Sequence, residues 1–217
     1  MGYNDKIQMK LLGIGLLGVL LVVVGCGGSS GSARPMYYYT LDYSPPSVTM
    51  DRPLPFVVRV ERFTAAPPFD TQRIMYADKG LHRNAYASSR WVAPPGDMLA
   101  YLLARDLQRA RAFQAVIAPD EILSPTHVVK GWVEHFVEEG DARPAQAAMR
   151  VNITLLDSRS ADPVARILYQ SSYSAQVPLA ERTPAALADA MSAAASTMTS
   201  EIVHDIYDEL AANRTAR

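Results

Sequence analysis

The sequence predicts a single α/β (α+β) domain in which a mixed, largely antiparallel sheet is packed by two main helices. Two segments carry apolar residues at helical spacing, and three long segments between them alternate apolar and polar residues, as strands with one buried face do. Breaks that contain proline or glycine separate these segments. We expect the domain to span residues 36–211, followed by a short C-terminal tail at residues 212–217.

Short strands are expected before the first helix. The aromatic segment 36–41 favours a strand that Pro45 and Pro46 end, and residues 42–54 read as a connection. A further strand, buried on at least one face, is expected at residues 56–63. Two short extended segments follow at residues 73–76 and 84–86, with a turn at Lys79 and Gly80 between them.

The first helix is expected at residues 98–111. The Pro-Pro-Gly sequence at 94–96 disfavours helix upstream, and Asp97 is predicted to cap the free amides. Arg105, Asp106 and Arg109 should face solvent. The opposite face carries an i, i+3, i+4, i+8 stripe, for which core packing is favoured over a membrane or partner groove: Leu99, Leu102, Leu103 and Leu107.

Three long strands and a second helix are predicted in the rest of the chain. The strands, at residues 126–138, 149–157 and 165–177, have a period of two and are joined by turn residues, which favours an antiparallel meander. The closing helix should begin with Thr183 as its cap and Pro184 in its first position. Its apolar stripe consists of Leu187, Met191, Ala194, Ala195, Met198, Ile202, Ile206 and Leu210.

The N-terminal residues have the features of a lipoprotein signal. Lys6 and Lys10 precede an apolar and glycine run at residues 11–24, which is shorter than the roughly 20 residues that span a bilayer. Val-Val-Gly-Cys at 23–26 resembles the lipobox of bacterial lipoproteins, in which the cysteine is acylated. We therefore predict a signal peptide at residues 1–25, lipidation of Cys26 and a flexible tether at residues 26–35. A free cysteine after an ordinary signal or anchor helix is the alternative.

The residue after Cys26 indicates the membrane in which the protein is anchored, and the net charge limits the class of partner. Gly27 follows the cysteine, where an aspartate tends to retain lipoproteins in the inner membrane, so the outer membrane is favoured. Without residues 1–25 the chain has 19 basic and 21 acidic residues and a formal charge of −2, which argues against nucleic acid as a partner. Cys26 is the only cysteine, so the exported domain must be stable without an intramolecular disulfide.

The sequence contains no evident catalytic constellation. The four histidines, His82, His127, His135 and His204, have no metal-ligand spacing, and neither a nucleophile elbow nor a phosphate loop occurs. The acidic cluster of Glu138, Glu139 and Asp141 beside a glycine reads as a solvated loop. We therefore expect no enzyme activity, no metal and no cofactor, and a domain that binds, scaffolds or bridges.

Several features together resemble the ABC-type transport auxiliary lipoprotein family, the group that includes PqiC. They are the Tyr-Tyr-Tyr-Thr-Leu strand at 37–41, the strand at 56–63, Arg-Ile-Met-Tyr at 73–76, and Tyr86 followed by Arg-Trp at 90–91 before the prolines. The resemblance covers roughly residues 37–210. It implies a non-enzymatic, periplasm-facing accessory of an intermembrane lipid transport system, anchored in the outer membrane.

The resemblance also implies partners and candidate contact residues. The expected partners are an MCE-domain (mammalian cell entry) protein and, through it, an inner-membrane ABC transporter, and a homo-oligomer is possible for such proteins. Tyr76 and Trp91 are candidates for docking or for the core. Arg73 is a candidate partner of Asp78 or Glu61, or an exposed charge. The alternatives are a structural or assembly lipoprotein that binds lipopolysaccharide machinery or peptidoglycan, and an envelope hydrolase.

Overall fold

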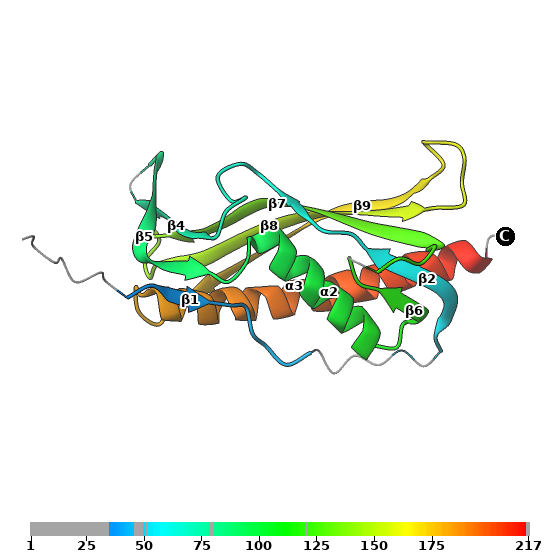
Figure 1. Cartoon of the computed structure of the whole chain (residues 1–217), viewed down its shortest axis with the longest axis horizontal. Helices are drawn as coiled ribbons and strands as arrows, with labels where there is room; N and C mark the ends of the chain where they lie inside the picture. Colours follow the sequence, from blue (N-terminus) through cyan, green and yellow to red (C-terminus); the bar gives the residue numbers. More distant parts are fainter. Residues whose placement is uncertain (1–34, 46–49, 51, 79, 120, 216–217) are drawn as a thin grey trace, which may run out of the picture. The chain divides into compact units, whose positions relative to one another are not determined.

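The computed structural model describes residues 35–45, 50, 52–78, 80–119 and 121–215 (Figure 1). The predicted signal peptide, Cys26 and nearly all of the tether lie outside these residues. From Met36 onward the described residues form one compact unit. Neither of its helices combines the length and the apolar character that crossing a membrane requires.

Nine strands form one mixed sheet around a long central strand, β7 (His127–Glu139). Along one edge of β7 lies β8 (Gln146–Asp157), which in turn pairs with β9 (Ile167–Pro178); both pairings are antiparallel and form the longest ladders. Along its other edge, three shorter strands follow one another, each parallel to β7: β2 (Leu54–Val60), β3 (Thr64–Ala65) and β4 (Arg73–Asp78).

The remaining strands extend the two ends of the sheet. At the end near His127, β6 (Phe113–Ile117) pairs in parallel with β2. At the end near Glu139, β5 (His82–Trp91) forms an antiparallel hairpin with β4, and β1 (Tyr37–Tyr39) adds in parallel to β5. Gly80 has φ +72 in the hairpin turn, a conformation that glycine adopts without strain. The predicted mixed, largely antiparallel sheet is confirmed.

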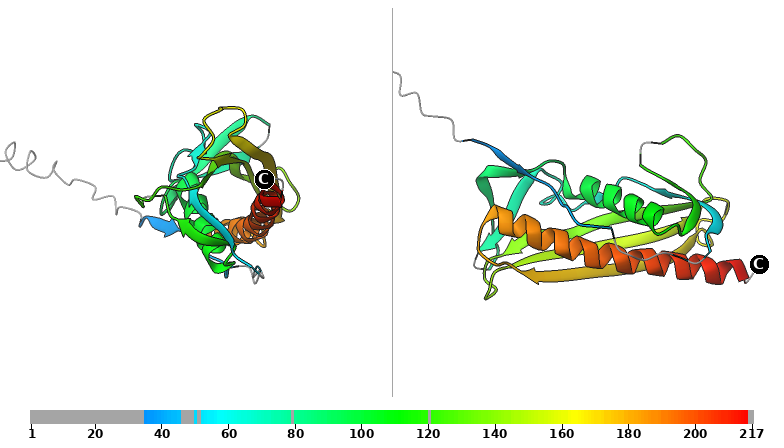
Figure 2. Two further views of the ribbon diagram at one scale, coloured as in Figure 1. Left: turned by 90° about the vertical axis from the view of Figure 1, so that its right-hand side faces the viewer. Right: turned by 90° about the horizontal axis from the view of Figure 1, so that it is seen from below.

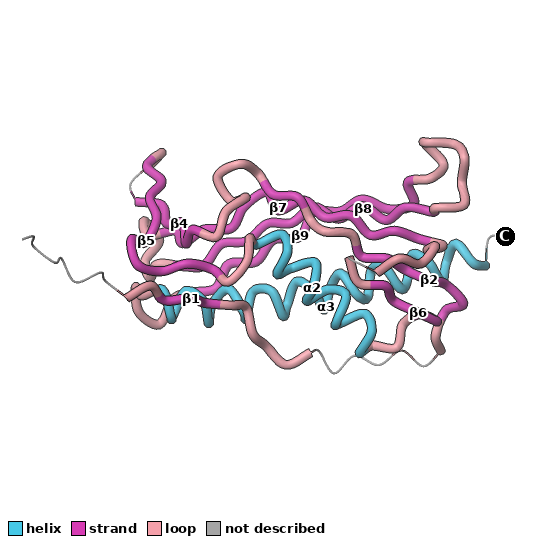
Figure 3. The backbone as a smooth tube through the Cα atoms, in the orientation of Figure 1, coloured by secondary structure: helices cyan, strands magenta, loops and turns pink. Residues whose placement is uncertain are grey.

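Two helices, α2 (Pro95–Arg109) and α3 (Pro184–Thr215), cover the same face of the sheet (Figures 1 and 2). Figure 3 shows β7 and β8 running along the upper part of the domain and α3 along its lower part. The predicted leucine stripe of α2 and the whole predicted stripe of α3 are buried. They pack against the inward positions of the central strands, among them Val133, Met149, Val151, Ile153 and Leu155.

The start of α3 agrees with the prediction, and the start of α2 does not. Thr183 Oγ1 accepts the amide of Ala186 at 3.2 Å, and Pro184 takes the first position of α3. In α2 the cap is Pro94 without a side-chain hydrogen bond, so the predicted capping role of Asp97 is wrong. Pro95 has no amide hydrogen to satisfy, and Asp97, already inside the first turn, pairs with Arg62 at 3.0 Å.

Two acidic residues expected in solvent are buried. Asp106 was predicted on the wet face of α2 but is 1 % exposed, because it accepts hydrogen bonds from the Tyr43 hydroxyl at 2.7 Å and from Arg105 Nε at 2.9 Å. Glu138 was predicted in a solvated loop but lies in β7 and is fully buried. In addition, β6 was not predicted, and β5 is longer than the segment 84–86.

The segment that follows β1 is held between the two helices. The amide of Asp42 donates to Ser192 Oγ at 3.0 Å, and the Tyr43 hydroxyl contacts Thr199 Oγ1 of α3 at 2.9 Å as well as Asp106 of α2. Because the aromatic ring is largely buried, these bonds are shielded from competing water. The chain therefore enters the domain through β1 and a following segment that is hydrogen-bonded to both helices.

Candidate functional site

Of the three residues named from the sequence, Trp91 lies deepest. Its side chain is 1 % exposed at the end of β5 and packs edge-to-face on Phe136 of β7, with ring centroids 5.4 Å apart. Its amide donates to the carbonyl of Gln72 at 2.7 Å. In this position the indole fills the core between the sheet and the helices.

Tyr76 belongs to a polar cluster around a buried carboxylate. Its half-buried ring lies 5.1 Å from that of Tyr86, and the guanidinium of Arg182 lies 5.6 Å from its centroid. Glu138 is the centre of the cluster: it accepts the Tyr86 hydroxyl at 2.6 Å and Arg182 Nε at 2.5 Å, while Arg182 also pairs with Asp78. Burial, and then the hydrogen bond to Glu138, raise the pKa of the Tyr86 phenol.

Arg73 lies at the surface of β4. Its side chain is exposed and forms no ion pair within the described part of the chain. The two carboxylates considered as its partners are taken by other residues, since Asp78 pairs with Arg182 and Glu61 with Lys130 at 3.3 Å. Arg182 follows the last strand, and no local pattern in the sequence connects it with Asp78 or Glu138, so its role was not predicted.

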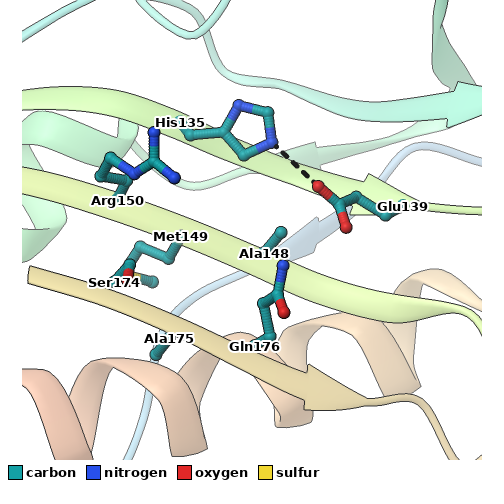
Figure 4. A pocket seen from close by; sticks show the side chains of 8 residues that line it. All are labelled: His135, Glu139, Ala148, Met149, Arg150, Ser174, Ala175 and Gln176. Atoms are coloured by element: carbon teal, nitrogen blue, oxygen red, sulfur yellow. Dashed lines mark hydrogen bonds and ion pairs between the residues drawn. The ribbon is translucent and has the colours of Figure 1, made fainter. Parts of the chain in front are cut away.

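A polar pocket of about 380 Å³ lies on the face of β7, β8 and β9 that the helices leave uncovered (Figure 4). His135 Nε2 lies 3.3 Å from Glu139 Oε1, and Gln146 Nε2 donates to the other Glu139 oxygen at 2.8 Å. Arg150, in the middle strand, pairs with Glu134 at 3.3 Å, and the hydrogen bond from Asn152, together with Arg150, lowers the pKa of Glu134.

The pocket lacks the arrangement that nucleophilic catalysis needs. Its serine, Ser174, is in register with Arg150, which is in register with His135, so two strand spacings, about 10 Å, separate the backbones of the serine and the histidine, and no hydrogen bond joins their side chains among the described residues. A nucleophile and its base need hydrogen-bond contact at about 3 Å. No group of three or more His, Cys, Asp or Glu side chains in the described ranges could hold a metal ion. The pocket offers hydrogen bonds to a polar ligand.

A second candidate is a pair of hollows on the surface of α2, which we call the α2 groove. Tyr101 and Asp97 line both hollows, which measure about 330 and 370 Å³. One hollow continues to Val92, Leu102 and the segment after β1, and the other to Arg62, Pro119 and Glu121. Tyr101 is 65 % exposed and Val92 is 47 % exposed, so the groove presents apolar surface between charged side chains.

Tyr101 was not predicted as a site residue, although the sequence indicates its exposed position. The buried stripe of α2 includes Leu99, Leu102 and Leu103, which places position 101 on the outward face. An aromatic residue there has an apolar ring in contact with water and a hydroxyl available for a partner, a combination that is enriched in protein interfaces. The rest of the groove is assembled from segments far apart in the sequence.

The fold is shared with solved structures. A Xanthomonas campestris protein of the family DUF330 is 20% identical to this chain, and its structure matches with a TM-score of 0.70. The match covers 83% of this chain and 98% of that protein. An uncharacterized protein is 13% identical, with a TM-score of 0.62 and coverage of 79% and 99%. No curated protein matches the sequence. At these identities the likeness shows the fold alone.

The family is shown by the sequence itself. A family model described as the ABC-type transport auxiliary lipoprotein component matches residues 39–203, which extend from the last residue of β1 into the second half of α3. The match includes β4 and β5, which contain the Arg-Ile-Met-Tyr, Tyr86 and Arg-Trp features of the resemblance, and the helix α2 that follows them. This chain therefore belongs to the ABC-type transport auxiliary lipoprotein family and is an auxiliary component of such transport systems.

Proposed function

We propose that this protein is a non-enzymatic, periplasm-facing accessory of an intermembrane lipid transport system, anchored in the outer membrane by acylated Cys26. In this role it docks an MCE-domain protein, which in turn contacts an inner-membrane ABC transporter. The observation that carries the proposal is the family match over most of the folded domain, combined with the lipobox-like sequence at 23–26. Two or more acyl chains give stable anchoring where a single chain is marginal.

A docking role suits the physical problem of lipid transport. Exposing an acyl chain to the aqueous periplasm costs about 25 cal/mol per Å² of apolar surface, so a partner that shields the chain needs a docking point at the far membrane. The pocket in Figure 4 is lined largely by polar side chains, including His135, Glu139, Arg150 and Gln176, and gives an acyl chain little apolar contact. This favours docking of a transport protein over carriage of the lipid by the domain itself.

We assign the docking contact to the α2 groove. Tyr101 has the properties of an interface anchor: a large, mostly exposed aromatic side chain on a rigid helix, flanked by hollows and by the charged side chains of Arg62, Asp97 and Arg105. Such an anchor typically contributes at least about 2 kcal/mol of binding free energy when a partner buries it.

The test is a cross-linking pull-down with single-residue variants of the full-length lipoprotein. Tyr101→Ala should lower recovery of the MCE-domain protein at least about tenfold, because a loss of about 2 kcal/mol weakens binding more than that. Trp132→Ala is the matched control, since Trp132 is also an exposed aromatic residue but lies on the face of β7 opposite the buried Val133 and lines neither hollow of the groove. Equal recovery with both variants would remove the groove from the docking site. Recovery of cell-wall or outer-membrane assembly partners alone would favour an assembly lipoprotein.

A further inference from the structure

The strands at one end of the sheet present a surface that neither the core nor the α2 groove uses. It is formed by β1 and the β4–β5 hairpin, which lie together at one end of the domain (Figure 1). We call it the hairpin-end surface and define it by four residues. Two are apolar or aromatic and strongly exposed, namely Tyr38 (62 %) and Leu81 (96 %), and two are exposed arginines, Arg73 and Arg83.

The strand register places aromatic and basic groups in one row. Tyr38 of β1 is in register with Arg90 of β5, which is in register with Arg73 of β4, so the three side chains share one face of the sheet. That face points away from the core, because the next register position pairs Tyr39 with the buried Trp91.

The arginines are available for an external anion. In the described residues, neither Arg73 nor Arg83 forms an ion pair. Arg83 donates only to the backbone carbonyls of Gly80 and His82, which keeps its guanidinium at the turn beside Leu81. Leu81 is almost fully exposed beside an arginine without an ion pair, in a turn that also contacts the Asp141 carboxylate, which accepts the Gly80 amide at 3.1 Å. An exposed leucine beside an arginine is a poor fit to water and a good fit to the headgroup layer of a membrane.

The chain length outside the folded domain brings a membrane within reach of this surface. Ten residues lie between Cys26 and Tyr37, and the eleven Cα–Cα steps of a fully extended chain between them span at most about 40 Å. Because the connection ends in β1, the folded domain is attached to the anchor through the hairpin-end surface itself. The other end of β7 lies about 40 Å further along the 13-residue strand.

We propose that the hairpin-end surface docks on an anionic phospholipid bilayer. Arg73 and Arg83 contact the lipid phosphates, Leu81 inserts into the headgroup–acyl boundary, and Tyr38 lies at the level of the headgroups. The proposal rests on the proposed anchoring through Cys26 and adds an orientation to it. The domain stands on the membrane with its β1, β4 and β5 end down, and the His127 end of β7 points into the periplasm.

The test uses full-length lipidated protein in vesicles and a fluorophore at an introduced cysteine. The chain has a single cysteine, Cys26, whose thiol is consumed by acylation, so His82→Cys supplies one reactive thiol beside Leu81, and Ala165→Cys supplies one in the exposed β8–β9 connection. The vesicles contain either phosphatidylcholine or equal parts of phosphatidylethanolamine and phosphatidylglycerol. Both carry a lipid with a nitroxide near the headgroup, which quenches only a fluorophore that is close to it.

We expect strong quenching at position 82 in the anionic vesicles, weaker quenching in phosphatidylcholine and little at position 165. Adding Arg73→Gln and Arg83→Gln should lower the contact equilibrium roughly 25-fold, about fivefold for each arginine. Arg109→Gln with Arg166→Gln is the matched control, because it removes two exposed arginines outside the hairpin-end surface and should leave the quenching unchanged.

Flotation with the vesicles is measured first and tests the anchor separately. A protein that fails to float has no membrane anchor, which overturns both the anchoring and the surface that rests on it. A protein that floats but shows equal quenching at positions 82 and 165, or the same quenching after the arginine substitutions, retains its anchor and overturns the hairpin-end surface. Cross-linking of the label at position 82 to a second copy or to a transport protein would likewise overturn membrane docking.

Discussion

Glu138 shows how a single buried charge joins three parts of the molecule. The carboxylate belongs to β7, its donors are Tyr86 of β5 and Arg182 just before α3, and Arg182 continues to Asp78 at the end of β4. A buried carboxylate is tolerated only when such donors compensate for its lost hydration. The cluster therefore fixes the β4–β5 hairpin relative to the start of α3.

Arg182→Ala should lower the free energy of unfolding by about 2 kcal/mol, because it leaves the Glu138 carboxylate with one of its two described donors. We place the effect below the full cost of breaking a buried pair, since the Arg182 side chain is 43% exposed. Arg150→Ala is the control: both side chains of its pair with Glu134 are exposed, so its loss should lower the free energy of unfolding much less than Arg182→Ala does. Urea unfolding that shows equal losses would contradict the role of Glu138.

Three tyrosines, of which Tyr173 is buried and Tyr43 and Tyr86 are partly buried, make the stability of the domain sensitive to high pH. Burial is the main cause that raises the pKa values of Tyr43, Tyr86 and Tyr173, and each hydroxyl also donates to a carboxylate. A raised pKa in the folded state means that folding favours the protonated phenol. The corresponding stabilisation is complete below the unfolded value of about pH 10 and is lost as the pH rises beyond it.

The measurement is an alkaline titration that follows phenolate absorbance and circular dichroism together. We expect part of the absorbance change to appear only with loss of the native dichroism signal, because these three phenols ionise when the domain unfolds. Complete ionisation of every tyrosine while the native signal persists would contradict their burial.

At the scale of elements, Phe63 determines how closely α2 approaches the sheet. A Cβ added to Gly96 of α2 would lie only 2.4 Å from the backbone carbonyl oxygen of Phe63. A Cβ added to Gly131 of β7 would lie only 2.4 Å from the Phe63 ring. Phe63 is buried, so neither its carbonyl nor its ring can move into solvent to make room for an added methyl group. The two glycines thus allow the chain between β2 and β3 to pass between helix and strand.

Gly131→Ala should destabilise the domain by about 1–3 kcal/mol, because the added methyl group overlaps the Phe63 ring. The same substitution in a Phe63→Ala background should cost much less, since the ring is then absent. Thermal or urea unfolding of the four proteins in this double-mutant cycle measures the coupling. Additive effects would mean that Gly131 is needed for another reason.

Elements with a local pattern were predictable from the sequence. The alternation in β8 and β9, the leucine stripe of α2 and the Thr183 cap of α3 all depend on neighbours within a few residues. The partners of Asp106 and Glu138 were not, because Tyr43 lies 63 positions from Asp106 and Arg182 lies 44 positions from Glu138. The short β6 was missed because it gains its stability by parallel pairing with the distant β2.

At the scale of the whole molecule, two separate surfaces are available for two different binding partners. The hairpin-end surface lies where the chain arrives from Cys26, and the α2 groove offers Tyr101 on the helical side of the domain. In the proposed role the first surface contacts the membrane and the second contacts the transport complex. An accessory that links a membrane to a complex needs both contacts at once.

The most direct test of this role is a cross-linking pull-down of the full-length lipoprotein from whole envelopes, compared with Cys26→Ala. The account predicts that an MCE-domain protein is recovered with the acylated protein and is lost or strongly reduced with Cys26→Ala, since only the anchored protein is held where the transport complex reaches the outer membrane. Recovery of cell-wall or outer-membrane assembly proteins without an MCE-domain protein would contradict the transport role and leave a lipoprotein of envelope assembly.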